Sequence, residues 1–305
     1  MHPIAFFAGT RYNDSRKRPG GMTMKQIEHC KLDEERALYA LKDAQVRNCE
    51  FAGPADGESA LKECRNIEVE DCLFRLRYPF WHTEHARIRR IDMNVDCRAA
   101  MWYDRDFHVE DSHLGGIKAF RECENASLRN CTAESTEFGW CCRDLKIDSC
   151  KLLSEYPFLH CERMEIDHLE MKGKYSFQYC RDVVIRNSVL DTKDAFWHSD
   201  HVTVYDSVIK GEYLAWYSSN LRLVRCRIIG TQPLCYCKNL ILEDCTMEQC
   251  DLSFENSEVH ATVCSSIDSV KNPASGSISC ERVGELIEDE YQWTPHGCEI
   301  SETRA

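Results

Sequence analysis

The sequence lacks the features that would place it in several common classes. No run of 18 consecutive apolar residues occurs, so no transmembrane helix is expected. The N-terminus has no basic start followed by a long apolar core, so we expect no secretory signal and a cytoplasmic protein. Basic residues are scarce, since 38 Lys and Arg stand against 51 Asp and Glu, a formal net charge of −13. Nucleic acid is therefore a poor partner, because its phosphates are bound by concentrated Lys and Arg.

A Cys-x-x-Cys motif is also missing, although the chain has 20 cysteines. Zinc ribbons, ferredoxins and thioredoxin-like redox sites therefore have little support, and we expect neither a metal nor another cofactor. A reducing cytoplasm would keep the thiols free. The high number of cysteines then needs a structural explanation.

A repeat of about 19 residues supplies that explanation. The segment 142–152 resembles the segments 19 residues before and after it, 123–133 and 161–171. A period near 20 is typical of a solenoid, in which stacked coils bury faces that no single coil could bury. The frame predicts 14 copies, which begin at Met22, Leu41, Cys64, Thr83, Asp104, Cys123, Cys142, Cys161, Cys180, Ser199, Ser218, Cys237, Asn256 and Ser275.

Within each copy, apolar residues at positions 4 and 6 alternate with polar residues at positions 5 and 7, as Leu145, Lys146 and Ile147 illustrate. This alternation predicts a strand with one buried face. Further apolar residues at positions 9, 11 and 17 predict three short strands per coil. Strands of successive coils then run parallel, so we expect an all-β fold, a single-stranded right-handed parallel β-helix.

The repeat also divides the chain into three parts. Solenoids need caps that protect the open strand edges of their terminal coils. We expect an N-terminal cap at residues 1–21, the parallel β-helix at 22–283 and a C-terminal cap or tail at 284–305.

Fourteen cysteines fall at two positions of the repeat. Cysteine is small, apolar and readily buried, so we expect both columns to point inward beside a bend as free thiols. Position 1 holds Cys64, Cys123, Cys142, Cys161, Cys180 and Cys237, and position 9 holds Cys30, Cys49, Cys72, Cys131, Cys150, Cys226, Cys245 and Cys264.

Position 18 follows the buried position 17 and is expected to face outward. A row of indoles beside carboxylate, amide and imidazole groups suits sugar rings, whose C–H faces stack on aromatic rings while their hydroxyls need polar partners. Alternatively, the rings turn into the core, form a stabilising ladder, or are covered by a protein partner, a second copy of the chain or its own tail. The candidate ligand-binding residues are Trp81, Trp102, Trp140, Trp197 and Trp216 at position 18, with Tyr217 and Tyr236 at position 19.

One cluster of charged residues is a candidate for catalysis, although the sequence leaves open whether the chain is an enzyme. Asp194 and Glu212 belong to adjacent coils, where two carboxylates could act as acid and base in glycoside cleavage. Lys193 or His198 could instead abstract a proton beside a uronate, as a polysaccharide lyase would require. Alternatively, all four are solvated charges at a bend.

Five short strings resemble an uncharacterised bacterial family, a domain of unknown function within the pectin-lyase-like β-helices. The resemblance implies a right-handed β-helix in a cytoplasmic bacterial protein and no established activity. The chain departs from the enzymes of that superfamily, because it has no GHG, RIK or NTD motif and no clear counterpart of the acidic calcium triad of pectate lyases. The strings span residues 78–81, 193–197, 211–216, 232–237 and 271–276.

Three functions fit these features. The first is binding of, or action on, a carbohydrate through the aromatic column. The second is a non-catalytic scaffold whose column binds a protein partner or a second copy of the chain. The third is an enzyme that acts on a small metabolite.

Overall fold

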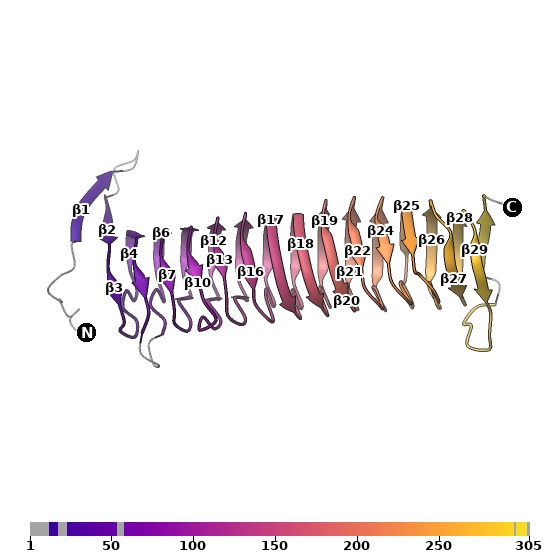
Figure 1. Ribbon diagram of the computed structural model, residues 1–305, viewed down its shortest axis with the longest axis horizontal. Helices are drawn as coiled ribbons and strands as arrows, with labels where there is room; N and C mark the ends of the chain where they lie inside the picture. Colours follow the sequence, from indigo (N-terminus) through magenta and orange to yellow (C-terminus); the bar gives the residue numbers. More distant parts are fainter. Residues whose placement is uncertain (1–11, 18–22, 54–57, 296, 304–305) are drawn as a thin grey trace. The chain divides into compact units, whose positions relative to one another are not determined.

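The computed structural model describes residues 12–17, 23–53, 58–295 and 297–303. The chain forms two compact units, residues 1–132 and 133–305, here called unit 1 and unit 2. All regular structure in the described ranges is β (Figure 1). Within those ranges no helix has the length and hydropathy needed to cross a bilayer.

Unit 1 is a stack of parallel coils, each with three sides. The first side consists of six-residue strands paired in parallel from coil to coil: β2 (Thr23–Glu28), β4 (Lys42–Arg47), β6 (Arg65–Glu70), β9 (Glu84–Arg89), β12 (Arg105–Glu110) and β15 (Glu124–Arg129). The second side has the short strands β3 (Lys31–Leu32), β5 (Glu50–Phe51), β7 (Leu73–Phe74), β10 (Asp92–Met93) and β13 (His113–Leu114). The third side has β8 (Phe80–Trp81), β11 (Met101–Trp102) and β14 (Phe120–Arg121).

Unit 2 repeats this arrangement with longer strands, after β16 (Thr132–Glu134) at the boundary between the units. The first two sides of its coils are formed by β17 (Arg143–Glu155), β18 (Glu162–Lys174), β19 (Arg181–Arg186), β20 (Val189–Lys193), β21 (Asp200–Tyr205), β22 (Val208–Lys210), β23 (Ser219–Val224), β24 (Arg227–Ile229) and β25 (Leu240–Glu248). The last strands are β26 (Glu258–Val263), β27 (Ile267–Lys271), β28 (Ser275–Cys280), β29 (Val283–Ile287) and β30 (Cys298–Glu302). The expected right-handed parallel β-helix, with a period near 19 residues, is confirmed.

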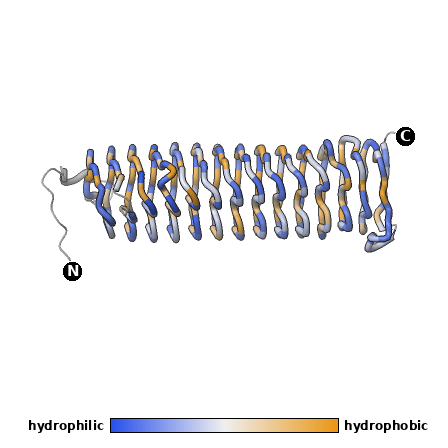
Figure 2. Tube along the Cα trace, turned by 60° about the horizontal axis from the view of Figure 1, so that its bottom comes forward, coloured by the Kyte–Doolittle hydropathy of each residue, from blue (hydrophilic) through white to orange (hydrophobic). Residues whose placement is uncertain are grey.

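The predicted register is confirmed in both units. Leu145 lies opposite Met164 and Ile147 opposite Ile166, and all four side chains are buried. The hydropathy pattern recurs at the same place in successive coils (Figure 2). Position 17 is also buried as predicted: Phe80, Phe120, Phe158, Phe177, Phe196 and Leu234 have no exposed surface.

The third side of unit 2 differs from the extended strand that the repeat predicts. At positions 15, 17 and 19 the backbone is left-handed, with φ of 59° at Tyr175, 58° at Phe177 and 56° at Tyr179. The coils remain joined, because these amides donate alternately to the next coil and to the preceding one. Left-handed backbone disfavours β-branched residues, and none occupies these positions in the five coils from Tyr156 to Tyr236. The alternation buries position 17 and turns position 19 outward.

The cysteine columns are buried with one exception. All six cysteines at position 1 and seven of the eight at position 9 are buried, and every cysteine is a free thiol. Many donate to a carbonyl 22 residues earlier, as Cys161 Sγ does to Gly139 (2.6 Å) and Cys180 Sγ to Phe158 (2.7 Å). Cys264 was predicted to point inward and is exposed. The reason is a register shift after Leu242, because Cys245 lies opposite Val263 and the next residue faces outward.

The frame is also wrong at the last predicted copy. Glu258 lies opposite Ser275, a step of 275 − 258 = 17 residues, so the copy expected at Ser275 is displaced by two residues. Within the expected C-terminal cap, β29 pairs with β27 and β30 pairs with β28, both in parallel. In the expected N-terminal cap, β1 (Tyr12–Lys17) pairs antiparallel with β2, and residues 1–11 and 18–21 lie outside the described ranges. The capping roles stay predictions.

Candidate functional site

The tryptophans of position 18 are half-buried and connect adjacent coils of unit 2. Trp197 Nε1 donates to the Tyr213 carbonyl (2.7 Å) and Trp216 Nε1 to the Gln232 carbonyl (2.8 Å). In both cases the acceptor is position 15 of the next coil. Gln178 occupies position 18 in a coil without tryptophan, and its Nε2 donates to the matching Asp194 carbonyl (3.3 Å). The shared chemistry of the column is therefore an N–H group that satisfies a neighbouring carbonyl.

The remaining tryptophans of the column follow this rule only in part. Trp140 Nε1 donates to the Tyr156 carbonyl (2.6 Å) in unit 2. In unit 1, Trp81 and Trp102 stack on one another with centroids 5.4 Å apart, and their buried Nε1 atoms have no acceptor among the described residues. Lys62 Nζ lies 4.0 Å from the Trp81 centroid. An indole face that a sugar could use is thus already covered at Trp81.

Position 19 carries a continuous row of exposed rings in unit 2, here called the ring ladder: His160, Tyr179, His198, Tyr217 and Tyr236. Successive centroids lie 4.9, 5.0, 5.2 and 4.8 Å apart, with interplanar angles between 7° and 22°. Tyr179 is 47% exposed and Tyr217 46%. Because neighbouring rings cover each other's faces, the ladder presents ring edges, hydroxyls and imidazole nitrogens to solvent.

The C-terminal tail covers one end of the ring ladder. Trp293 lies 5.9 Å from Tyr236, centroid to centroid, and its backbone N–H donates to Asn256 Oδ1 (2.9 Å). The Tyr236 hydroxyl donates to Glu255 Oε2 (3.0 Å). Burial and this carboxylate raise the pKa of Tyr236, so its hydroxyl stays protonated. The tail therefore covers the last rung and leaves the others to solvent.

Asp194 replaces a ring in the column at position 15. Tyr156 and Tyr175 of this column stack 4.6 Å apart, and Asp194 follows them, 4% exposed, with no partner for its Oδ2 among the described residues. Burial raises the pKa of Asp194, opposed by the charge of Lys193 and reinforced by that of Glu212. The buried carboxyl is thus more readily protonated than an ordinary aspartate.

The structure brings together three of the four catalytic candidates. Lys193 Nζ and Glu212 Oε2 form an exposed ion pair (3.0 Å), and this bond raises the pKa of Lys193. Asp194 interacts electrostatically with both. His198 belongs to the ring ladder, and no bond to Asp194 or Glu212 is found within the described part of the chain. The cluster thus has one buried acid, but its second carboxylate is held by a lysine.

Asp104 is a buried acid that the sequence reasoning missed. It occupies position 1, the column of cysteines, with no exposed surface. Its Oδ1 accepts a hydrogen bond from the Thr83 amide (2.7 Å), whereas Oδ2 has no partner in the described ranges. Burial raises the pKa of Asp104 well above its usual range, and neighbouring Cys123 adds to the effect. A charged residue in an inward column was the signal in the sequence.

One surface cluster in unit 2 has the chemistry of a metal site. Ligand atoms of Asp148, Asp167 and His168 lie within 4.8 Å of one another. Ser149 Oγ donates to Asp148 (2.9 Å), Asn187 Nδ2 donates to Asp167 (2.8 Å), and His168 Nδ1 pairs with Asp167 (3.0 Å). These bonds already use the ligand atoms, so we assign no metal to the cluster.

Solved parallel β-helices resemble the chain in fold. The surface adhesin PfbA of Streptococcus pneumoniae is 9% identical over 80% of this chain and 83% of its own, with a TM-score of 0.43. The A-module of the mannuronan C-5 epimerase AlgE6 of Azotobacter vinelandii is 10% identical over 90% and 87%, with a TM-score of 0.38. The tailspike protein of E. coli bacteriophage HK620, solved with a hexasaccharide, is 9% identical over 90% and 62%, with a TM-score of 0.36.

At these identities the likeness concerns the fold alone. Among curated proteins, none matches the sequence. Residues 25–301 match the family described as "Protein of unknown function (DUF3737)", and the chain, a pectin-lyase-like parallel β-helix, belongs to this family.

Proposed function

We propose that the chain binds a linear carbohydrate along the ring ladder of unit 2 without cleaving it. The observation that carries the proposal is the exposed row of five rings, which repeat every 4.8 to 5.2 Å from His160 to Tyr236. This spacing is close to the length of one sugar residue in an extended chain. A glycan aligned with the stack would therefore meet one ring per sugar.

The chemistry of the ladder supports a sugar more than an apolar partner. Tyrosine and histidine combine apolar ring edges with hydroxyl and imidazole groups, and such mixed surfaces suit sugars, which have C–H groups beside hydroxyls. Ion pairs flank the ladder, with Lys174 Nζ 3.1 Å from Glu155 and Lys193 Nζ 3.0 Å from Glu212. Their carboxylates and ammonium groups offer further hydrogen bonds to hydroxyls.

Binding without cleavage fits the state of the candidate catalytic groups. Glu212 is held by Lys193, and Asp194 is buried beside them. Acid–base cleavage of a glycosidic bond needs two carboxyl groups that both reach the bond. We therefore expect Asp194→Asn to leave carbohydrate binding intact and the wild-type chain to release no new reducing ends from a bound oligosaccharide.

A panel of neutral and acidic oligosaccharides, titrated against tyrosine and tryptophan fluorescence, tests the proposal. Tyr179→Ala and Tyr217→Ala should each weaken binding roughly fivefold, because an aromatic contact is worth about 1 kcal/mol. Tyr205→Ala is the matched control, since Tyr205 lies outside the ladder, near Arg186. Absence of binding to the whole panel, or equal weakening by the control, would refute the proposal. Dimerisation lost in Tyr179→Ala would instead favour a second copy as the occupant.

The proposal includes a cytoplasmic location. Thiols stacked in columns, such as Cys142, Cys161 and Cys180, stay free only where the surroundings are reducing. A carbohydrate of the cell interior is then the expected ligand. Localisation of the tagged full-length protein by cell fractionation tests this part, and recovery outside the cytoplasm would contradict it.

A further inference from the structure

The outer face of the long strands of unit 1 pairs its charges across neighbouring coils. The strands β4, β6, β9, β12 and β15 carry six arginines. Five of them lie close to a glutamate of a neighbouring strand: Arg47 and Glu70 (3.2 Å), Arg65 and Glu84 (3.4 Å), Arg89 and Glu110 (3.4 Å), Arg105 and Glu124 (3.5 Å), and Arg129 and Glu110 (2.9 Å). The sixth, Arg87, has no hydrogen bond or ion pair within the described residues.

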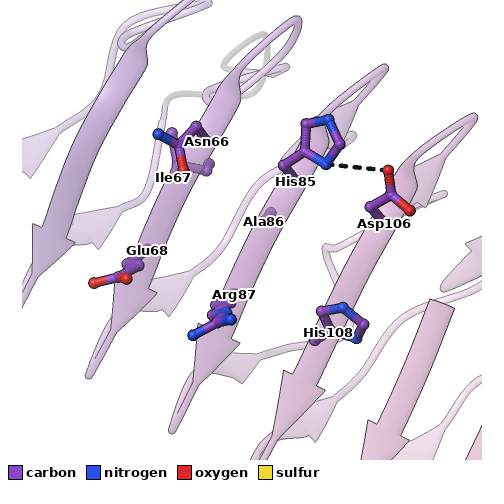
Figure 3. Close-up of a pocket in the computed structure, with 8 residues that line it drawn as sticks. All are labelled: Asn66, Ile67, Glu68, His85, Ala86, Arg87, Asp106 and His108. Atoms are coloured by element: carbon purple, nitrogen blue, oxygen red, sulfur yellow. Dashed lines mark ion pairs between the residues drawn. The ribbon is translucent and has the colours of Figure 1, made fainter. Parts of the chain in front are cut away.

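Arg87 is unpaired because both of its cross-strand neighbours bond to a different strand. Glu68 and His108 lie directly opposite it on β6 and β12. Gln45 Nε2 donates to Glu68 Oε2, and a hydrogen bond of 2.7 Å joins His108 Nδ1 to Ser127 Oγ. Figure 3 shows the Glu68 carboxylate directed away from Arg87. The guanidinium is therefore left exposed between two side chains that are held by other partners.

Two adjoining hollows share Arg87, and together they are here called the Arg87 groove. The first has a volume of about 190 Å³, with Ala86 and Ile67 at its floor and His85 and Asp106 at its side. The second has a volume of about 400 Å³ and extends along the same strands to Glu110 and Ser127. In the first hollow His85 Nδ1 pairs with Asp106 Oδ2 at 3.0 Å (Figure 3).

The donors and acceptors of the Arg87 groove define the ligand it fits. A guanidinium presents N–H groups as a rigid fork that matches a carboxylate with two parallel hydrogen bonds. Around it lie the carboxylates of Glu68, Asp106 and Glu110, which accept bonds from hydroxyls and repel an anion of higher charge. We propose that the Arg87 groove binds a small monocarboxylate that carries neighbouring hydroxyls. Sugar acids and open-chain hydroxy acids share this chemistry.

The groove lies in unit 1 and the ring ladder in unit 2, so this proposal does not depend on the proposed function. Isothermal titration of the full chain with D-glucuronate, D-gluconate, D-glucose and inorganic phosphate tests it. At least one of the two carboxylates should bind, and glucose and phosphate should bind at least tenfold more weakly. Preference for glucuronate identifies a cyclic sugar acid as the ligand, and preference for gluconate identifies an open-chain hydroxy acid.

Two variants make the result specific to the groove. Arg87→Gln should weaken carboxylate binding roughly tenfold or more, because hydrogen bonds to a charged partner are the strong ones. Arg105→Gln is the matched control, since Arg105 lies on the same face but pairs with Glu124, and it should leave the affinity unchanged. Both residues are exposed, so circular dichroism should be that of the wild type. No binding of either carboxylate in the millimolar range, equally tight binding of phosphate or glucose, or equal weakening by both variants would overturn the proposal.

Discussion

Replacing Trp197 separates the two contributions of its indole. Trp197→Phe keeps a ring to stack on Trp216, now 5.5 Å away with an interplanar angle of 3°, but removes the N–H group that the Tyr213 carbonyl accepts. Loss of this hydrogen bond should cost about 0.5–1.5 kcal/mol in the free energy of unfolding. Trp197→Ala removes the ring as well. Truncation of a fully buried tryptophan costs about 3–5 kcal/mol, so for this half-buried ring we expect about 2–3 kcal/mol.

Urea unfolding followed by circular dichroism measures these differences. Gln178→Ala is a matched control, because it removes a similar hydrogen bond at position 18 without removing a ring. It should cost about as much as Trp197→Phe, again about 0.5–1.5 kcal/mol. If Trp197→Ala unfolded at the wild-type urea concentration, the indole would not connect the coils and its faces would be free for a ligand. If Trp197→Phe cost as much as Trp197→Ala, the reasoning that separates ring from N–H group would be wrong.

Three further results are expected. Ile147→Asp should unfold unit 2 because it places a charge in the core, whereas Lys146→Asp should keep a near-normal thermal melt; equal tolerance of both would contradict the register. Asp104 has a raised pKa in the folded state, so its contribution to stability is lost as pH rises above its unfolded value of about 4. Asp104→Asn should therefore raise the free energy of unfolding at pH 7, with the gain vanishing below pH 4, and a pH-independent effect would argue against this. Alkylation followed by mass spectrometry should modify exposed Cys141 in the native protein and Cys161 only after denaturation, because burial raises the pKa of the Cys161 thiol.

The fold could be predicted because each long strand has one buried face and most coils have the same length. Under these conditions a shift by one residue would expose every apolar side chain, so Leu145 and Ile147 have only one favourable register. The same argument explains the error at Cys264. A local shift between β25 and β26 leaves no mark in the composition of the segment, and a single residue past the shift faces the other way.

The candidate site could be predicted less well, because alternation along a strand does not describe its backbone. The third side of unit 2 is left-handed at every second residue, so position 18 is half-buried and position 19 carries the exposed ladder. Asp194 and Glu68 show a second limit. Whether each carboxylate is buried, paired or turned aside depends on side chains in neighbouring coils, such as Lys193 and Gln45, whose rotamers the sequence does not reveal.

The constant step of unit 2 makes the coil a unit of length that can be gained or lost whole. Glu162, Arg181, Asp200 and Ser219 face each other in succession, each 19 residues after the last. Deletion of residues 180–198 would bring β21 against β18 with every apolar contact in register, whereas deletion of one residue fewer would invert every strand that follows. Duplication or loss of such a segment would lengthen or shorten the ring ladder by one rung. Related chains could thus match ligands of different length by changing the number of coils alone.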